Sequence, residues 1–63
     1  MTTQNFHRDG IAYQITGPIN LGKHKGQTAR WFVDKVIPCD GYESTKNVFN
    51  APSYDECYGW LMQ

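Results

Sequence analysis

The last thirteen residues constrain the fold most, because they have the pattern of a short helix that cannot stand alone. Ser53 is followed three positions later by Glu56, a capping-box spacing that marks the start of a helix. Apolar residues then recur at three- and four-residue intervals, at Tyr54, Cys57, Trp60 and Leu61. A helix of about ten residues is marginal in water by itself. The rest of the chain must therefore supply a surface on which this helix packs.

That surface is predicted to be a β-sheet. The stretches with strand composition are residues 11–16, 29–37 and 42–50. In the first, Ile11, Tyr13 and Ile15 alternate with smaller or polar residues, as in a strand with one buried face. The second is the richest in β-branched and aromatic residues; Trp31 and Val33 share one of its faces, and Phe32 and Val36 share the other.

Turn-forming residues separate these stretches. Asp9-Gly10 is a turn signal, and the polar residues 1–8 before it are expected to form a loose or edge segment. Gly17-Pro18 is expected to end the first strand and to open a loop over residues 17–28, and Pro38 is expected to end the second. Asp40-Gly41 is a favoured dipeptide for a tight hairpin.

The predicted fold class is α+β: a three-stranded antiparallel β-sheet with one C-terminal α-helix packed on one face, in the order β-β-β-α. Residues 1–63 are expected to form a single small domain, since the chain has no room for a second core. The predicted core consists of Ile11, Tyr13, Ile15, Trp31, Val33, Val36, Phe49, Cys57, Trp60 and Leu61. Gly59 breaks the helical pattern, and we expect either close packing of its backbone against an aromatic ring or a helix that frays after Tyr58 and has its last turn completed by a partner.

Charge argues against a strong electrostatic hold on nucleic acid or an anionic membrane. The chain has six basic and six acidic residues and a formal net charge of zero. The charges are unevenly distributed, with a net +3 in residues 1–35 and −3 in residues 36–63. The N-terminus lacks the pattern of a signal peptide and no stretch is long enough to span a membrane, so a cytoplasmic location with free thiols is expected.

The candidate binding residues fall into two groups. The Gly22–Gly26 stretch carries Lys23, His24 and Lys25, whose charge could meet a phosphate or carboxylate, although the Walker spacing is absent. The remaining candidates are basic or aromatic residues of the predicted strands: Arg30, Phe32, Lys35 and Tyr42. A solvated turn and ordinary core aromatics are the structural alternatives for these two groups.

No catalytic, metal-binding or cofactor-binding residues are predicted. The only conceivable zinc ligands, His7, His24, Cys39 and Cys57, have no close C-x-x-C or H-x₃₋₅-H pair. Cys57 fits a small core residue and Cys39 a partly exposed thiol. Nothing in the local sequence supports a cysteine nucleophile with a histidine as its base. So short a chain also has little room for a concave site from which water is excluded.

The order of three strands and a C-terminal helix resembles the topology of the small arm-type DNA-binding domains of phage integrases and of plant AP2 modules. The resemblance covers residues 11–62 and rests on the element order, the Arg30-Trp31 strand start and the helix from Ser53 to Trp60-Leu61. In those domains the sheet lies in the major groove, so the resemblance implies a DNA-binding sheet face. It is a likeness of topology and carries no diagnostic motif.

The leading functional hypothesis is a small non-enzymatic binding module that docks on another protein as an accessory factor or inhibitor. The expected contact surface is the sheet face around Phe32 and Tyr42 or the 17–28 loop, with self-association through an open strand edge as a further option. Compact single domains of this kind are common among phage and mobile-element products. The alternative is a nucleic-acid-binding domain that uses the basic loop and a sheet face.

Overall fold

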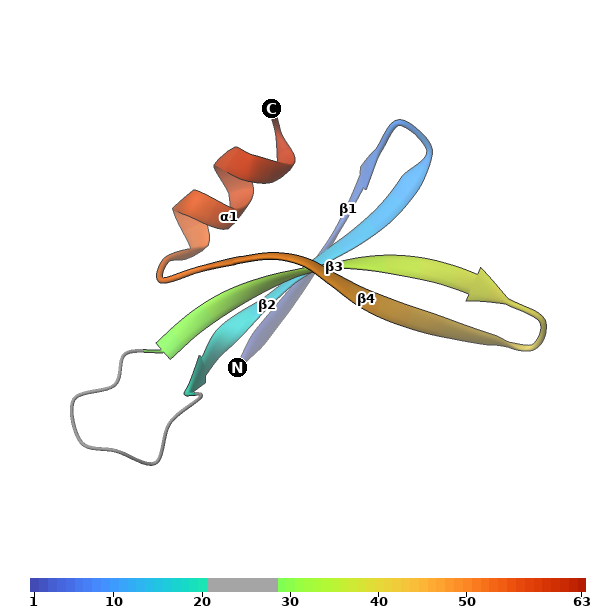
Figure 1. The fold of residues 1–63 in the computed structure, drawn as a ribbon, viewed down its shortest axis with the longest axis horizontal. Helices are drawn as coiled ribbons and strands as arrows, with labels where there is room; N and C mark the ends of the chain where they lie inside the picture. Colours follow the sequence, from blue (N-terminus) through green and yellow to red (C-terminus); the bar gives the residue numbers. More distant parts are fainter. Residues whose placement is uncertain (21–28) are drawn as a thin grey trace.

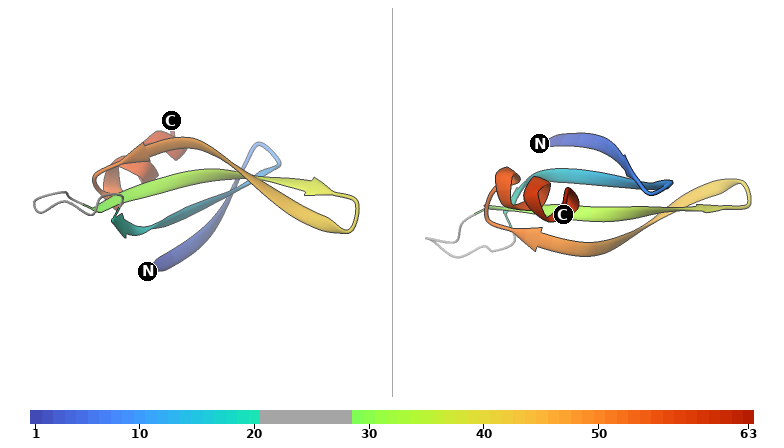
Figure 2. Two further views of the ribbon diagram at one scale, coloured as in Figure 1. Left: turned by 60° about the horizontal axis from the view of Figure 1, so that its bottom comes forward. Right: turned by 90° about the horizontal axis from the view of Figure 1, so that it is seen from above.

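A four-stranded antiparallel sheet and one helix make up the fold (Figure 1). The computed structural model describes residues 1–20 and 29–63. The elements are β1 (Thr2–Arg8), β2 (Ile11–Asn20), β3 (Ala29–Cys39), β4 (Tyr42–Ala51) and α1 (Tyr54–Leu61). The strands are neighbours in chain order, and α1 packs over one face of the sheet at one end (Figure 2). The predicted α+β layout is confirmed, but the predicted count of three strands is wrong.

The additional strand is β1, which was not counted among the predicted strands, although a loose or edge segment was expected there; it is an edge strand. It pairs with β2 from Thr2↔Gly17 to Arg8↔Ile11. The connecting residues Asp9 and Gly10 both have positive φ, 52° and 78°, the conformation of the tight turns that suit hairpins. Most of β1 is exposed because it is an edge strand and α1 packs mainly against β2, β3 and β4. It therefore needs no apolar alternation to pair.

Side chains of β1 also reach α1 directly. The Tyr54 hydroxyl donates to the side-chain oxygen of Gln4 at 2.6 Å, and the ring of Phe6 lies edge-on to that of Tyr58, with centroids 5.8 Å apart. The guanidinium of Arg8 donates to the carbonyl of Leu61, the last residue of the helix, and to that of Gln63 just beyond it. These contacts hold β1 to the part of the chain furthest from it in sequence.

Two of the predicted strand ends are wrong. β2 continues past Gly17-Pro18 to Asn20, through a register shift between Thr16 and Ile19. Gly17 fits here because a Cβ at this position would lie 2.7 Å from the Trp31 ring. The rest of the predicted 17–28 loop, residues 21–28, lies outside the described residues.

β3 likewise continues through Pro38 to Cys39. Pro38 pairs with Glu43 of β4, beyond the last β2–β3 pair at Tyr13↔Lys35. The strand has a neighbour on one side only at this point, and proline is tolerated at such an edge. The predicted Asp40-Gly41 hairpin is confirmed, with Gly41 at φ 80°.

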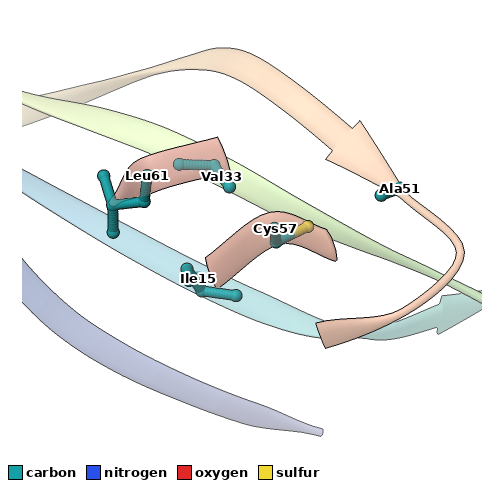
Figure 3. Packing of buried hydrophobic residues seen from close by; sticks show 5 residues of the cluster. All are labelled: Ile15, Val33, Ala51, Cys57 and Leu61. Atoms are coloured by element: carbon teal, nitrogen blue, oxygen red, sulfur yellow. The ribbon is translucent and has the colours of Figure 1, made fainter. Parts of the chain in front are cut away.

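The helix begins as its capping pattern predicts. The Ser53 hydroxyl accepts from the backbone N–H of Glu56 at 3.3 Å and donates to the Glu56 carboxylate at 3.1 Å. The cluster of buried residues beneath α1 consists of Ile15, Val33, Ala51, Cys57 and Leu61 (Figure 3). The residues of one sheet face thus meet the apolar stripe of the helix, as the pattern of the last thirteen residues requires.

The predicted core is confirmed at its centre and corrected at its margin. Ile15, Val33, Cys57 and Leu61 are fully buried, and Ala51 joins them although it was not predicted. The aromatic members of the predicted core are partly buried and pack around this centre: Tyr13, Trp31, Phe49 and Trp60. Ile11 is also only partly buried, and Val36 is buried on the other face of the sheet.

Both expectations for Gly59 are wrong. Apart from its chain neighbours and the backbone of its own helix, a Cβ at this position would meet no heavy atom of the described residues within 4 Å, so close packing does not require glycine. The helix also continues past Tyr58 to Leu61. Nothing in the structure explains the glycine.

Candidate docking surface on the β3–β4 arm

The β3–β4 hairpin projects beyond the part of the sheet that α1 covers. Pairing between β2 and β3 ends at Tyr13↔Lys35, whereas pairing between β3 and β4 continues to Cys39↔Tyr42. The two hairpins therefore diverge, as Figure 1 shows. We call residues 35–46 the β3–β4 arm. The buried cluster under α1 contains none of its residues.

The two faces of the arm follow from register. Directly opposite residues of an antiparallel pair share a face, and successive residues alternate between faces. Val33 faces α1, so Lys35, Ile37 and Cys39 continue on its side. Their partners on β4 complete what we call the helix-side face of the arm: Lys46 opposite Lys35, Ser44 opposite Ile37, and Tyr42 opposite Cys39.

Apolar side chains on the helix-side face are open to solvent. Tyr42 is 66% exposed and Ile37 36% exposed. They occupy neighbouring rows of the ladder, Ile37↔Ser44 and Cys39↔Tyr42. A tyrosine in this position offers a rigid ring with a polar end, a common anchor at protein interfaces.

The helix-side face also carries a like-charged pair. Lys35 and Lys46 are directly opposite each other across the ladder. Like charges so placed repel and destabilise a sheet modestly. In residues 1–20 and 29–63 neither lysine forms an ion pair, and the acidic side chains of Asp34 and Glu43 lie on the other face by register.

A groove opens between the two diverging hairpins. Its volume is about 450 Å³, within the range of small ligand-binding pockets. The β1–β2 hairpin contributes His7, Gly10, Ile11 and Ala12, and the arm contributes Lys35, Val36, Ile37, Pro38 and Glu43. The lining of the groove is therefore mainly apolar, and the arm adds one lysine and one carboxylate to it.

The face opposite α1 is more polar. Phe32 is half-buried there between Thr16 and Asn50, its partners on the neighbouring strands. The Nε of Arg30 donates to the side-chain oxygen of Asn50 at 2.9 Å. Arg30 and Phe32 thus share this face, which we call the open face.

A bulge on β4 shapes the root of the arm. Val33 pairs with Phe49 and Asp34 pairs with Asn47, so Val48 is the extra residue. The Asn47 amide nitrogen lies 3.1 Å from the Val33 carbonyl oxygen and 3.0 Å from that of Phe49. The asparagine therefore bridges the two strands where the ladder is interrupted.

The predicted binding residues do not form a single surface. Arg30 and Phe32 lie on the open face, whereas Lys35 and Tyr42 lie on the helix-side face of the arm. The candidates Lys23, His24 and Lys25 lie outside the described residues. Phe32 and Tyr42, which were expected to share one sheet face, thus lie on opposite faces.

Sequence reasoning missed Ile37 and Lys46, although a signal for both was present. The two-residue Asp40-Gly41 turn pairs Cys39 with Tyr42, and counting outward from that pair places Lys35 opposite Lys46.

The two cysteines have different environments. Cys57 is fully buried, its thiol donates to the Trp31 carbonyl at 3.4 Å, and burial raises the pKa of this thiol. Cys39 is only partly buried near the tip of the arm. The part of the chain that the structure describes has no cluster of three or more His, Cys, Asp or Glu side chains able to hold a metal ion.

Comparisons with known proteins identify no relative. No family model, curated protein or solved structure matches the chain. Among the described residues, no helix has the length and apolar character needed to cross a membrane. The functional interpretation therefore rests on the surface features described above.

Proposed function

We propose that this protein is a small non-enzymatic binding module that docks on another protein through its β3–β4 arm. The observation that carries the proposal is the exposure of Ile37 and Tyr42 on one face of an arm outside the buried cluster under α1. Exposing apolar side chains to water is unfavourable, and a partner that covers them recovers that free energy. The groove between the two hairpins shares Lys35 and Ile37 with this face.

Affinity capture from the lysate of the native host tests this proposal. The baits are the wild type, Ile37→Ser and Tyr42→Ala, with Met62→Ser as the control because Met62 is also an exposed apolar residue but lies at the end of α1. Thermal unfolding first establishes that all four baits are folded. We expect the two arm variants to lose proteins that the wild type and Met62→Ser both retain. Identical capture by all four baits would refute docking through the arm.

Nucleic-acid binding through the open face is the second candidate. The observation that favours it is the presence of Arg30 and Phe32 on one face, flanked by Thr16 and Asn50. A cation beside an aromatic ring and polar side chains can contact phosphates and bases. Lys35 lies on the other side of the sheet and would not contribute to this surface.

Salt separates the two candidates. The affinity of a complex held by contacts to phosphates falls steeply between low and physiological salt, whereas the affinity of an apolar protein interface changes little. Gel shifts with single- and double-stranded DNA and RNA at low salt are the first assay. A complex that Arg30→Gln weakens and Tyr42→Ala leaves intact would favour nucleic acid, and no shift at low salt would eliminate it.

A further inference from the structure

The charges of the β3–β4 arm are separated between its two faces. Lys35 and Lys46 lie side by side on the helix-side face, whereas Glu43 of the arm, and Asp34 immediately before it, lie on the other. The arm therefore presents a basic face and an acidic face, although the chain as a whole is neutral. The basic face is also the one that bears the exposed Ile37 and Tyr42.

We propose that the helix-side face of the arm binds an acidic, apolar segment of a partner protein. This inference rests on the proposed function, because it names the chemistry of the protein partner that docks on the arm. Carboxylates of the partner would lie against Lys35 and Lys46, and an apolar side chain would lie against Ile37 and Tyr42.

Charge complementarity is the first argument for this partner. Lys35 and Lys46 are opposite each other and neither forms an ion pair within residues 1–20 and 29–63. A carboxylate placed between them removes the repulsion of the pair while it gains two attractions. A basic or neutral partner would leave the repulsion in place.

Spacing is the second argument. Lys35 and Ile37 are two residues apart on one strand, so their side chains leave the same face roughly 6–7 Å apart. An extended peptide repeats its own side chains at that interval. A glutamate and an apolar residue two positions apart on the partner therefore match the lysine row and the Ile37 row together.

The tip of the arm argues for a protein segment over a nucleic acid. Asp40 precedes Tyr42 by two residues in the turn and Glu43 follows it on the other face, so both add negative charge near the tip of the arm. A phosphate backbone that approached Tyr42 would be repelled by the negative charge of the tip. A peptide can place its acidic residue at the lysines and an apolar residue at the tip.

Backbone amide chemical shifts in a peptide titration test the proposal. The probe is a short synthetic peptide with glutamate and leucine two residues apart and serine at the positions between. Control peptides replace glutamate by glutamine or leucine by serine. We expect the probe to shift the amides of Lys35, Ile37, Tyr42 and Lys46, and each control peptide to bind more weakly.

Matched variants locate the contact. Replacing both lysines, Lys35→Gln with Lys46→Gln, should raise the Kd of the probe about tenfold, the loss expected for two exposed charge contacts. Arg30→Gln removes one cation from the open face and should leave the Kd unchanged. Equal binding by the double variant and the wild type, or no shift at the arm, would overturn the proposal.

Two further measurements separate this inference from its rivals. Single-stranded DNA that binds the arm more tightly than the peptide would overturn it in favour of nucleic acid. Sedimentation that shows self-association lost in the double lysine variant would assign the face to a second copy, and so overturn it as well. If Ile37→Ser abolishes capture from lysate but the probe does not bind, the proposed function stands and only this inference fails.

Discussion

Arg8 of β1 donates to the carbonyl of Leu61 at 3.0 Å, and so links residues at the two ends of the chain. Its second terminal nitrogen donates to the Gln63 carbonyl. The last turn of α1 has no basic residue of its own, so Arg8 supplies the cation that the negative end of the helix dipole favours. β1, the strand that was not predicted from the sequence, thus supplies the residue that caps the helix.

Arg8→Ala should therefore lower the free energy of unfolding by about 1–2 kcal/mol, since it removes charge-assisted hydrogen bonds to the helix end. Urea unfolding measures the change. Arg30→Ala is the matched control, because within residues 1–20 and 29–63 the Arg30 side chain bonds only the exposed side chain of Asn50, and its loss should cost less than 1 kcal/mol. Similar losses for the two variants would show that Arg8 does not act as a helix cap.

Two glycines should respond to alanine with opposite signs. Gly59→Ala should stabilise the protein by up to about 1 kcal/mol, because helix propensity improves and no described atom beyond the chain neighbours and the helix backbone lies within 4 Å of the new methyl group. Gly17→Ala should destabilise it, because the added Cβ would meet the Trp31 ring at 2.7 Å. Thermal unfolding of both variants checks the pair. A destabilised Gly59→Ala would mean that the helix packs more closely than the structure shows.

The elements that sequence reasoning located are those that bury an apolar face. α1 and the centres of β2, β3 and β4 have apolar periodicity because the fold covers them, and the capping residues mark where the helix begins. β1 has no such pattern, since it is an exposed edge strand whose one large apolar side chain, Phe6, packs on Tyr58. Its pairing comes from the Asp9-Gly10 turn and not from its composition.

Proline and glycine misled the prediction of strand ends for a related reason. Pro38 and Gly17-Pro18 break a strand only where the ladder needs their N–H groups or side chains, and that depends on the neighbouring strand. The candidate site was only partly predictable for the same reason. Arg30, Lys35 and Tyr42 were identified as a group by residue type, but which face each occupies depends on register.

The repulsion between Lys35 and Lys46 should be measurable in the isolated protein. Lys46→Glu replaces the like pair by an opposite pair across the ladder and should raise the free energy of unfolding by about 0.2–1 kcal/mol. The gain should shrink as salt is added, because both side chains are partly or fully exposed. Lys46→Gln should give part of the gain. Urea unfolding at low and high salt that shows no difference between wild type and Lys46→Glu would contradict the repulsion.

The two thiols should differ in both reactivity and pH dependence. Cys39 should react readily with iodoacetamide, whereas Cys57, fully buried and with a raised pKa, should react only on unfolding. Mass spectrometry of the native and urea-unfolded protein after brief labelling distinguishes them. Equal labelling of both cysteines in the native protein would show that the space beneath α1 is open.

The raised pKa of Cys57 also sets the sign of a pH effect on stability. The native thiol keeps its proton to higher pH than the unfolded thiol, whose pKa is about 8.5. Its contribution is therefore fully present below that pH, and the free energy of unfolding falls as pH rises above it toward the native pKa. Cys57→Ala should remove this fall, even though the lost packing lowers stability at every pH, and Cys39→Ala should retain it. Parallel pH profiles of the wild type and Cys57→Ala above pH about 8.5 would assign the alkaline loss to other groups.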